Sequence, residues 1–481
     1  MDFDKYKISK FSFDFDLGEY TAVYHAISME IVYVKKELYD VIKIHSNSII
    51  WEQSKENNIV TELIQRKFIV PFDENEDRII TDVAESLSVI RPITLRLQLT
   101  DVCNLNCTYC QIEKNYKHNK GLHMSKDVAK RSLKLFARHA PKHIQKTIIL
   151  TGGEPLLNYN VIETLLDYAK EVFDSYRFIL FTNGTKMTKP IAKKLMENNV
   201  LVLVSIDGSE RQHNLARKDF AEKGSFENAL TGFKICKECG CNVGISGVIG
   251  THNINQLASG ILKFFVKINP NSLGLNFPHY LLDADNSKIL PMEQYADAII
   301  NVYQELRKRG IYLENINRII EPFVKQKINA KECAALGRGI TVLPDGMVGP
   351  CKTLLVAGII GTSLEEIEKL EKLDDDEVFQ NWKNRSTYTM DKCKGCVGIS
   401  ICGTGCAYDS YAVNGNINGI DERACVLTKK ILNFLVTDLY GVTRKNGDLD
   451  IIIPSLTDRS QIYSAITLYE TDLKRSVGHE I

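Results

Sequence analysis

The chain lacks a net charge that would attract a polyanion. Lys plus Arg and Asp plus Glu each number 60 among its 481 residues, so the formal charge is +0 at pH 7. Without a basic field, we expect neither nucleic acid nor an anionic membrane surface as a partner. Long apolar runs are also lacking, because even Val200–Ile206 has the length of a strand and not of a membrane span.

A secretory signal is absent as well. The start, Met-Asp-Phe-Asp-Lys, shows no basic region followed by an apolar run, which predicts a cytoplasmic protein without a membrane partner. Hydrophobic residues make up 44% and charged residues 25% of the chain, as is typical of a soluble globular protein with a sizeable core. The length predicts two to four structural units.

The cysteines do not have the distribution of a disulfide framework. Of thirteen, three lie within Cys103–Cys110 and four within Cys393–Cys406, and the second group is flanked by Cys333, Cys351 and Cys425. In a protein that is not exported, such tight spacing is typical of metal binding. The other three sit at a helix end before a strand and are interpreted as small buried residues: Cys236, Cys239 and Cys241.

Residues 1–85 have the pattern of a small separate module. Thr21–Ser28 and Glu30–Val34 predict a hairpin, and Lys35–His45 and Asn58–Arg66 have helical apolar spacing. Strands and short helices in this order predict a winged helix. Its second helix offers few cations and is followed by the acidic segment Asp73–Asp77, so DNA is not the expected ligand.

From about Pro92 the pattern changes to alternating strands and helices. The expected strands are Thr94–Leu99, Thr147–Leu150, Phe178–Thr182, Val200–Ile206, Val243–Ile249 and Ser272–Phe277. The expected helices are Ser125–His139, Asn160–Phe173, Lys189–Asn198, Phe226–Cys239 and Ile254–Ile268. This alternation predicts an α/β partial (β/α)6 barrel over 86–310, whose reactive loops follow the strand ends. A Cys-rich unit is expected over 311–440, and 441–481 carries no chemical signal.

The first cysteine motif, Cys103-Asn-Leu-Asn-Cys107-Thr-Tyr-Cys110, directly follows the first barrel strand. Three thiolates hold only three irons of a four-iron cluster. A zinc or ferredoxin site would need a fourth ligand, and the nearby His118 is not at a usual spacing. The motif therefore predicts one open iron. This pattern, with an aromatic residue before the last Cys, resembles the radical S-adenosylmethionine (SAM) superfamily.

The resemblance implies a specific use of that open iron. In the family it chelates the amino and carboxylate groups of SAM, and one electron from a [4Fe–4S] cluster breaks the S–C5′ bond. The product is a 5′-deoxyadenosyl radical, so the cofactor supplies the chemistry and the protein supplies the position. A flavodoxin- or ferredoxin-type reductant is the partner implied as the source of the electron.

Later segments resemble the family's SAM-binding motifs. In Thr151-Gly-Gly-Glu-Pro155, Gly152 and Gly153 are expected to let the backbone approach the ligand, and Glu154 to accept from the SAM ammonium. By resemblance, Ser205 bonds the ribose and Arg217 pairs with the SAM carboxylate. Further SAM contacts are expected at Tyr109, Asn183, Asn276 and Phe277. For the last two, ordinary core packing is an open alternative.

The C-terminal cysteines read Cys333-x12-Gly346-x4-Cys351, then Cys393-x2-Cys396-x5-Cys402-x3-Cys406, then Cys425. This resembles the seven-cysteine SPASM pattern of radical SAM enzymes that modify peptides and proteins. A zinc ribbon would explain four of the cysteines and leave three. The resemblance assigns Cys393, Cys396, Cys402 and Cys425 to one auxiliary cluster. It assigns Cys333, Cys351 and Cys406 to another, which makes three [4Fe–4S] clusters in all.

Seven cysteines cannot fill eight ligand positions, so one auxiliary iron lacks a thiolate. A soft, open iron suits a substrate cysteine, and water, His279 or Asp345 are the alternatives. Sulfatase maturases are similar but add a cysteine within the segment that corresponds to Ala334–Thr341, which has none here. They also place an Asp, thought to act as a base, where this chain has Lys352.

Together these features predict a radical SAM oxidoreductase that abstracts hydrogen from a ribosomal precursor peptide and closes an intramolecular cross-link. A Cys thioether is the expected bond, with the electron leaving through the cluster of Cys333. Carbon–carbon or carbon–oxygen cross-linking and sulfatase-type oxidation are alternatives within the class. An iron–sulfur electron carrier or redox sensor is the alternative outside it, but it would need no SAM motif.

Residues 1–85 resemble the module that peptide-modifying radical SAM enzymes use to bind a precursor's leader. RiPPs are ribosomally made, post-translationally modified peptides, and this RiPP recognition element takes the leader as an added β-strand. We therefore expect leader binding by 1–85. A purely structural cap is the alternative.

Overall fold

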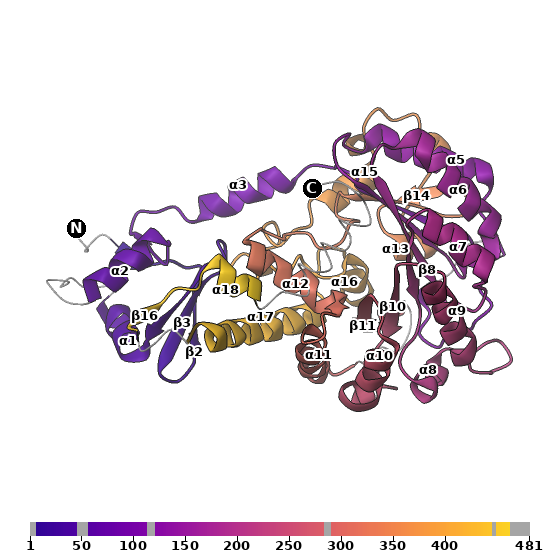
Figure 1. The fold of residues 1–481 in the computed structure, drawn as a ribbon. Coiled ribbons are helices and arrows are strands. Elements are labelled where there is room, and N and C mark those ends of the chain that lie inside the picture. Colours follow the sequence, from indigo (N-terminus) through magenta and orange to yellow (C-terminus); the bar gives the residue numbers. More distant parts are fainter. Residues whose placement is uncertain (1–5, 46–55, 113–120, 283–289, 445–448, 462–481) are drawn as a thin grey trace.

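The computed structural model describes residues 6–45, 56–112, 121–282, 290–444 and 449–461. Its largest sheet has ten strands in the order β12-β11-β10-β9-β8-β7-β6-β13-β14-β15. The six expected barrel strands pair in parallel and in chain order: β6 (Thr94–Gln98), β7 (Lys146–Thr151), β8 (Tyr176–Thr182), β9 (Leu201–Val204), β10 (Val243–Val248) and β11 (Ser272–Asn276). The predicted α/β partial barrel is confirmed (Figure 1).

The helices between these strands cover the outside of the barrel (Figure 1). They are α5 (Lys126–His139), α6 (Tyr159–Val172), α7 (Lys189–Glu197), α8 (Glu210–Ala216), α9 (Phe226–Glu238) and α10 (Leu262–Ile268). Helix α5 begins at Ser125, whose side chain accepts a hydrogen bond from the Val128 N–H, as an N-cap does. Ile254–Ile268 is helical as expected, although 3₁₀ and π turns precede α10.

The Cys-rich region continues the barrel sheet at both edges. Strand β12 (Tyr312–Leu313) pairs in parallel with β11, and β13 (Gly339–Val342) pairs in parallel with β6. Strands β14 (Met347–Gly349) and β15 (Thr362–Ser363) follow β13 as antiparallel neighbours. The expected boundary near residue 311 therefore separates the units in sequence, while backbone hydrogen bonds join them in space.

The remaining helices of the described chain support this region and pack beside the barrel. They are α11 (Met292–Arg307), α12 (Glu314–Lys325), α13 (Lys352–Val356), α14 (Leu364–Ile367), α15 (Glu377–Lys383), α16 (Ala407–Asn414) and α17 (Glu422–Thr443). Helix α14 begins with a capping box, in which the Ser363 hydroxyl accepts from the Glu366 N–H and the Glu366 carboxylate accepts from the Ser363 N–H. None of the described helices is both long and apolar enough to cross a membrane.

The N-terminal module contains the expected hairpin and both expected helices. Its elements are β1 (Tyr6–Ile8), β2 (Ser12–Asp16), β3 (Tyr20–His25), β4 (Ile31–Lys35), α1 (Lys36–His45), α2 (Glu56–Gln65), β5 (Ile69–Pro71) and α3 (Asp77–Leu87). Arg66, just after α2, is held by Glu62 at 2.6 Å and Glu30 at 3.0 Å. This pairing removes one of the few cations that a DNA-binding helix would need.

The C-terminal segment has a structural role that the sequence did not indicate. Strand β16 (Ile451–Ile452) pairs antiparallel with β4 of the N-terminal module, and α18 (Leu456–Gln461) follows it (Figure 1). Arg459 is 1% exposed and donates to the carbonyls of Met29 and Phe323. Residues 449–461, for which the sequence indicated no role, therefore connect the N-terminal module with α12 through their backbone and this arginine.

Candidate metal centres and cavity

A first group of thiols lies in the loop after β6, at the carboxyl end of the barrel strands. Burial raises the pKa of Cys103 to about 12, and the neighbouring Glu154, Cys107 and Cys110 add to the effect. Burial also raises the pKa of Cys107 to about 11, although nearby Arg217 opposes the shift. Thiols that influence one another in this way face a common space. A ligand that binds them as thiolates must overcome these raised pKa values.

The spacing of these thiols does not suit a single metal ion. Among the described His, Cys, Asp and Glu side chains, only His279, Cys406 and Asp409 bring three ligand atoms within 4.8 Å of one another. In a tetrahedral zinc site, bonds of about 2.3 Å would place two thiolates about 3.8 Å apart. An iron–sulfur cluster gives each thiolate its own iron and so accepts a wider spacing. The three-cysteine loop therefore fits a cluster. His118 lies outside the described residues.

The two glycines of the Gly-Gly-Glu-Pro segment position this loop. A Cβ on Gly152 would lie 2.6 Å from the Thr100 carbonyl oxygen, and one on Gly153 would lie 2.3 Å from that of Val102. The Gly153 N–H also donates to Thr100 O at 2.8 Å. The glycines thus let the chain's own segment before Cys103 approach closely, and their approach to a ligand stays a prediction.

Glu154 is completely buried beside the cysteine loop. Its carboxylate accepts from the Thr182 hydroxyl at 2.7 Å, the Asn183 N–H at 2.7 Å and the Leu156 N–H at 3.0 Å. Burial raises its pKa to about 6, and these three donors oppose the rise. Because a carboxylate has about four lone-pair positions, one stays available for a further donor. Asn183 also places its amide nitrogen 3.9 Å from the Cys103 sulfur.

Arg217 belongs to a buried network that the sequence did not indicate. Its Nε lies 3.0 Å from Asp207 Oδ1, and its guanidinium lies 5.4 Å from the centre of the Tyr109 ring. The Tyr109 hydroxyl donates to Asp207, which also accepts from the Val248 N–H at 2.8 Å. Asp207 therefore orients Arg217 and Tyr109 beside Cys107. Its place two residues after Ser205, at a strand end, was the available signal.

The other predicted SAM contacts lie at strand ends. Ser205 is half-buried directly after β9, and Asn276 and Phe277 line the cavity after β11. Asn276 accepts from the Asn315 amide at 2.8 Å, and Phe277 packs edge to face on Tyr295 at 5.5 Å. Asn276 and Phe277 therefore have packing partners of their own, and their role toward SAM stays a prediction.

A cavity of about 1040 Å³ lies inside the barrel and reaches the Cys-rich region. Arg96 and Lys352 line it, and neither has an ion pair with any described residue. Burial lowers the pKa of Lys352 to about 8, and the nearby Arg96 lowers it further, while Cys110 and Cys351 oppose the shift. Lys352 therefore lies between the first thiol group and the Cys-rich region. On β6, Gln98 is fully buried with both amide atoms unpartnered among the described residues.

The Cys-rich thiols form two groups with the membership that the resemblance implies. Burial raises the pKa of Cys425 to about 12, with contributions from Cys402, Cys393 and Cys396. Separately, burial raises the pKa of Cys406, with contributions from Asp409, Cys333 and Cys351. The second of these groups lines the cavity: Cys333, Cys351 and Cys406. Their ligand roles remain predictions, but the chain brings the thiols together as required.

Arg385 connects the two Cys-rich groups. It is 0% exposed, and its guanidinium donates to the Thr404 carbonyl at 2.9 Å and the Ser410 hydroxyl at 3.0 Å. Burial lowers its pKa, and thiols of both groups, Cys406 first, oppose the shift. A fixed positive charge at this place stabilises thiolates on both sides. Sequence inspection missed Arg385 because no motif surrounds it.

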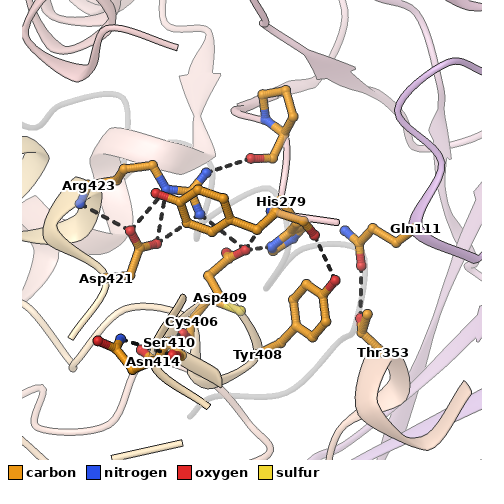
Figure 2. Close-up of polar contacts among 12 residues, drawn as sticks. Gln111, His279, Thr353, Cys406, Tyr408, Asp409, Ser410, Asn414, Asp421 and Arg423 are labelled. Carbon is orange, nitrogen blue, oxygen red and sulfur yellow. Dashed lines mark hydrogen bonds and ion pairs between the residues drawn. The ribbon is translucent and has the colours of Figure 1, made fainter. Parts of the chain in front are cut away.

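Of the two side chains considered for the missing ligand, the structure places one at the site. Asp345 is exposed in the turn between β13 and β14, where its carboxylate accepts from the Met347 N–H at 3.0 Å, so it is not near the cavity thiols. His279 lines the cavity and contacts Asp409 (Figure 2). The pKa of Asp409 is lowered, because His279 and Arg423 outweigh its burial.

The remaining cysteines lie away from these groups. Cys236 and Cys241 are buried at the end of α9 and before β10, which is the amino end of the barrel strands. The Cys241 thiol donates to the Ala192 carbonyl at 3.2 Å. The burial predicted for Cys236 and Cys241 is confirmed, whereas Cys239 is only partly buried.

The fold and these thiols define a partial α/β barrel protein with a cluster-type loop at its first strand and a Cys-rich domain on its sheet. Residues 97–258 match the family model of the radical SAM superfamily, so the chain contains a radical SAM domain. Radical SAM proteins bind a [4Fe–4S] cluster and SAM.

Similar proteins cover nearly the whole chain. The radical SAM cyclopropyl synthase TigE of Paramaledivibacter caminithermalis is 25% identical over 89% of this chain and 94% of its own. The structure of native anSMEcpe with bound AdoMet and Kp18Cys peptide has 20% sequence identity and a TM-score of 0.61. The match covers 74% of this chain and 99% of that one. Streptococcus suis SuiB bound to precursor peptide SuiA has 14% sequence identity and a TM-score of 0.52. The match covers 87% of this chain and 99% of that one. The two structures establish the similarity of fold.

Proposed function

We propose that this radical SAM enzyme is a maturase that forms an intramolecular bond in a ribosomal precursor peptide. The observation that carries the proposal is the position of the cavity, which extends from Gln111, beside Cys110, to Cys333, Cys351 and Cys406. A substrate placed there lies between the SAM-cleaving loop and an auxiliary thiol group. Peptides bound to anSMEcpe and SuiB, which share the fold, support a peptide as the substrate.

The chain's own residues have separable tasks in this proposal. The three-cysteine loop would hold a cluster that, with SAM, supplies the radical that removes hydrogen from a substrate carbon. Glu154 has one lone pair left that would accept from the SAM ammonium, and Arg217, oriented by Asp207, would pair with the SAM carboxylate. Two further cluster sites use the Cys333 group and the Cys393 group. The barrel wall around the cavity excludes water from the carbon radical.

Two bonds are candidates for the product. A carbon–carbon bond is favoured by the cyclopropyl synthase relative, which matches 89% of this chain. A cysteine thioether is favoured by the ligand count, which leaves one iron of the Cys333 group without a cysteine. Both products have lost two hydrogen atoms, so mass alone does not separate them. The difference lies in whether a substrate thiol is consumed.

The test uses reduced, anaerobically reconstituted full-length protein, SAM and synthetic peptides from the short reading frames beside the gene. We expect 5′-deoxyadenosine together with a peptide lighter by two hydrogens. Iodoacetamide then distinguishes the bonds, because a carbon–carbon product keeps its alkylatable thiols and a thioether product loses one. Formation of 5′-deoxyadenosine with no peptide of changed mass across these frames would contradict the maturase proposal.

For the N-terminal module, we propose that the leader pairs with β2. Strand β4 already has β16 on its outer edge, whereas no described strand pairs with the outer edge of β2. An unpaired edge is the place where an extended peptide adds as a strand. Hydrogen exchange of the full-length protein should show new protection of the β2 amides on adding precursor. Protection of neither edge would make the module a structural cap.

A further inference from the structure

One group of side chains in the cavity has the composition of a metal site. A ring nitrogen of His279, the sulfur of Cys406 and a carboxylate oxygen of Asp409 lie within 4.8 Å of one another. His279 follows β11 of the barrel, while Cys406 and Asp409 lie at the start of α16, so the tertiary structure alone brings them together (Figure 2). Among the described residues, no second group of this kind exists.

Asp409 is held in place from several sides. It is 0% exposed, its Oδ1 accepts from the Tyr280 N–H at 2.9 Å, and it lies 3.1 Å from the Arg423 guanidinium. Arg423 is fixed in turn by Asp421 at 2.9 Å and by stacking 3.6 Å from the centre of the Tyr280 ring (Figure 2). A carboxylate with this support keeps its charge and its orientation.

This carboxylate determines how His279 is presented. Its Oδ2 lies 2.6 Å from His279 Nδ1, so Nδ1 is the donor to the carboxylate, and in the neutral ring the lone pair is then on Nε2. The ring also packs edge to face on Tyr408 at 5.9 Å. The His279 side chain is 39% exposed and lines the same cavity as Cys333 and Cys351. A histidine bonded to a carboxylate through one nitrogen is the usual form of a metal ligand.

We propose that His279 supplies the fourth protein ligand of the cluster held by Cys333, Cys351 and Cys406. Asp409 is then a positioning residue that fixes the ring. The proposal rests on the cluster assignment within the proposed function, and it fills the eighth position that seven cysteines leave. With His279 as its ligand, that iron has no position for a substrate thiolate. The proposal therefore favours the carbon–carbon product over the thioether.

The first experiment reads the coordination directly. The full chain carrying Cys103→Ala, Cys107→Ala and Cys110→Ala is labelled with ¹⁵N-histidine, reconstituted and reduced, so that only the auxiliary clusters give a signal. Electron–nuclear double resonance should show one strongly coupled ¹⁵N nucleus. The coupling should vanish in His279→Ala and persist in His139→Ala, a matched control on the outer helix α5. No coupling, or coupling that survives His279→Ala, would overturn the proposal.

A second experiment covers the case in which His279→Ala does not retain its iron. His279→Cys should restore the iron content to the wild-type amount. The reduction potential of the cluster held by Cys333, Cys351 and Cys406 should then fall, because a thiolate replaces the imidazole.

¹³C-cyanide serves as the probe for an open iron in the chain that carries Cys103→Ala, Cys107→Ala and Cys110→Ala, because the first cluster has an open iron of its own. With His279 intact, this chain should give no ¹³C coupling. An auxiliary cluster that binds cyanide there has an open iron and overturns the proposal, since this is the outcome expected for water or a substrate thiolate in that position.

The role of Asp409 is tested by the same spectroscopy. Asp409→Asn keeps the shape of the side chain but removes its charge, so the ¹⁵N coupling should become smaller or heterogeneous while the iron content stays the same. An unchanged coupling would show that Asp409 does not position the ring. These readouts need neither SAM cleavage nor a peptide. Retained coupling without peptide modification would therefore contradict the proposed function alone.

Discussion

The first thiol group and the cavity-lining auxiliary group are built in different ways. Cys103, Cys107 and Cys110 come from one short loop, and their arrangement depends on the backbone contact of Gly152 and Gly153 with that loop. Cys333, Cys351 and Cys406 come from three separate segments: Cys333 precedes β13, Cys351 follows β14, and Cys406 lies at the start of α16. The geometry of a local loop changes when one Cβ is added beside it. The geometry of a long-range group changes when a buried polar residue that connects its segments is lost.

The largest expected effect separates the two groups completely. Replacing Cys103, Cys107 and Cys110 together with Ala removes all three protein ligands of the first cluster, so 5′-deoxyadenosine formation should be abolished. The auxiliary iron should remain, because its ligands lie on other segments. Iron analysis and chromatography of the SAM products measure both quantities. Normal SAM cleavage by this variant would refute the assignment of the loop.

The next largest effect is expected from a substitution that adds a single methyl group. In Gly153→Ala the new Cβ would lie 2.3 Å from the Val102 carbonyl oxygen, so the loop must move. A displacement on the order of 1 Å typically costs about 100-fold in rate, and we expect that loss in SAM cleavage. Gly260→Ala is the matched control, because nothing lies within 4 Å of its Cβ. Equal activity of the two variants would show that the close approach is unimportant.

A smaller effect is expected from Arg385→Met, which tests the long-range groups. The substitution leaves the buried carbonyl of Thr404 and the half-buried carbonyl of Gly419 without their donor, which should lower the free energy of unfolding by about 3 kcal/mol. Both auxiliary clusters should lose iron, while SAM cleavage per intact first cluster stays the same. The exposed Arg309 provides the control substitution. Loss of iron from only one group would show that Arg385 does not serve both.

The smallest effect is expected at Lys352, which lies between the groups. Lys352→Met removes a cation near Cys110 and Cys351, so the reduced, more negative clusters lose stabilisation and both potentials should fall. Iron content should not change. Lys267→Met, on the exposed side of α10, is the control, and redox titration followed by electron paramagnetic resonance is the measurement. A shift at one cluster alone would place Lys352 nearer to that cluster than to the other.

Much of the fold followed from periodicity. The six barrel strands and their helices were predicted nearly at their observed bounds, because short apolar strands and amphipathic helices have local patterns. The partition of the Cys-rich thiols came from a resemblance, and the structure groups the same residues. Glycine roles were not predictable, since a Cβ clash depends on a partner, Thr100 or Val102, about fifty residues away.

The sequence by itself determined the residue types and their spacings, and with them the chemistry that each loop can perform. Only the tertiary structure decided which polar side chains meet, such as Asp207 with Arg217, and Asp409 with His279 and Arg423. It also decided that the C-terminal strand β16 pairs with β4. The physical reason is that a thiol motif is encoded within a few residues. The partner and the burial of a charged side chain depend instead on segments far apart in the chain, which meet only when the sheet closes.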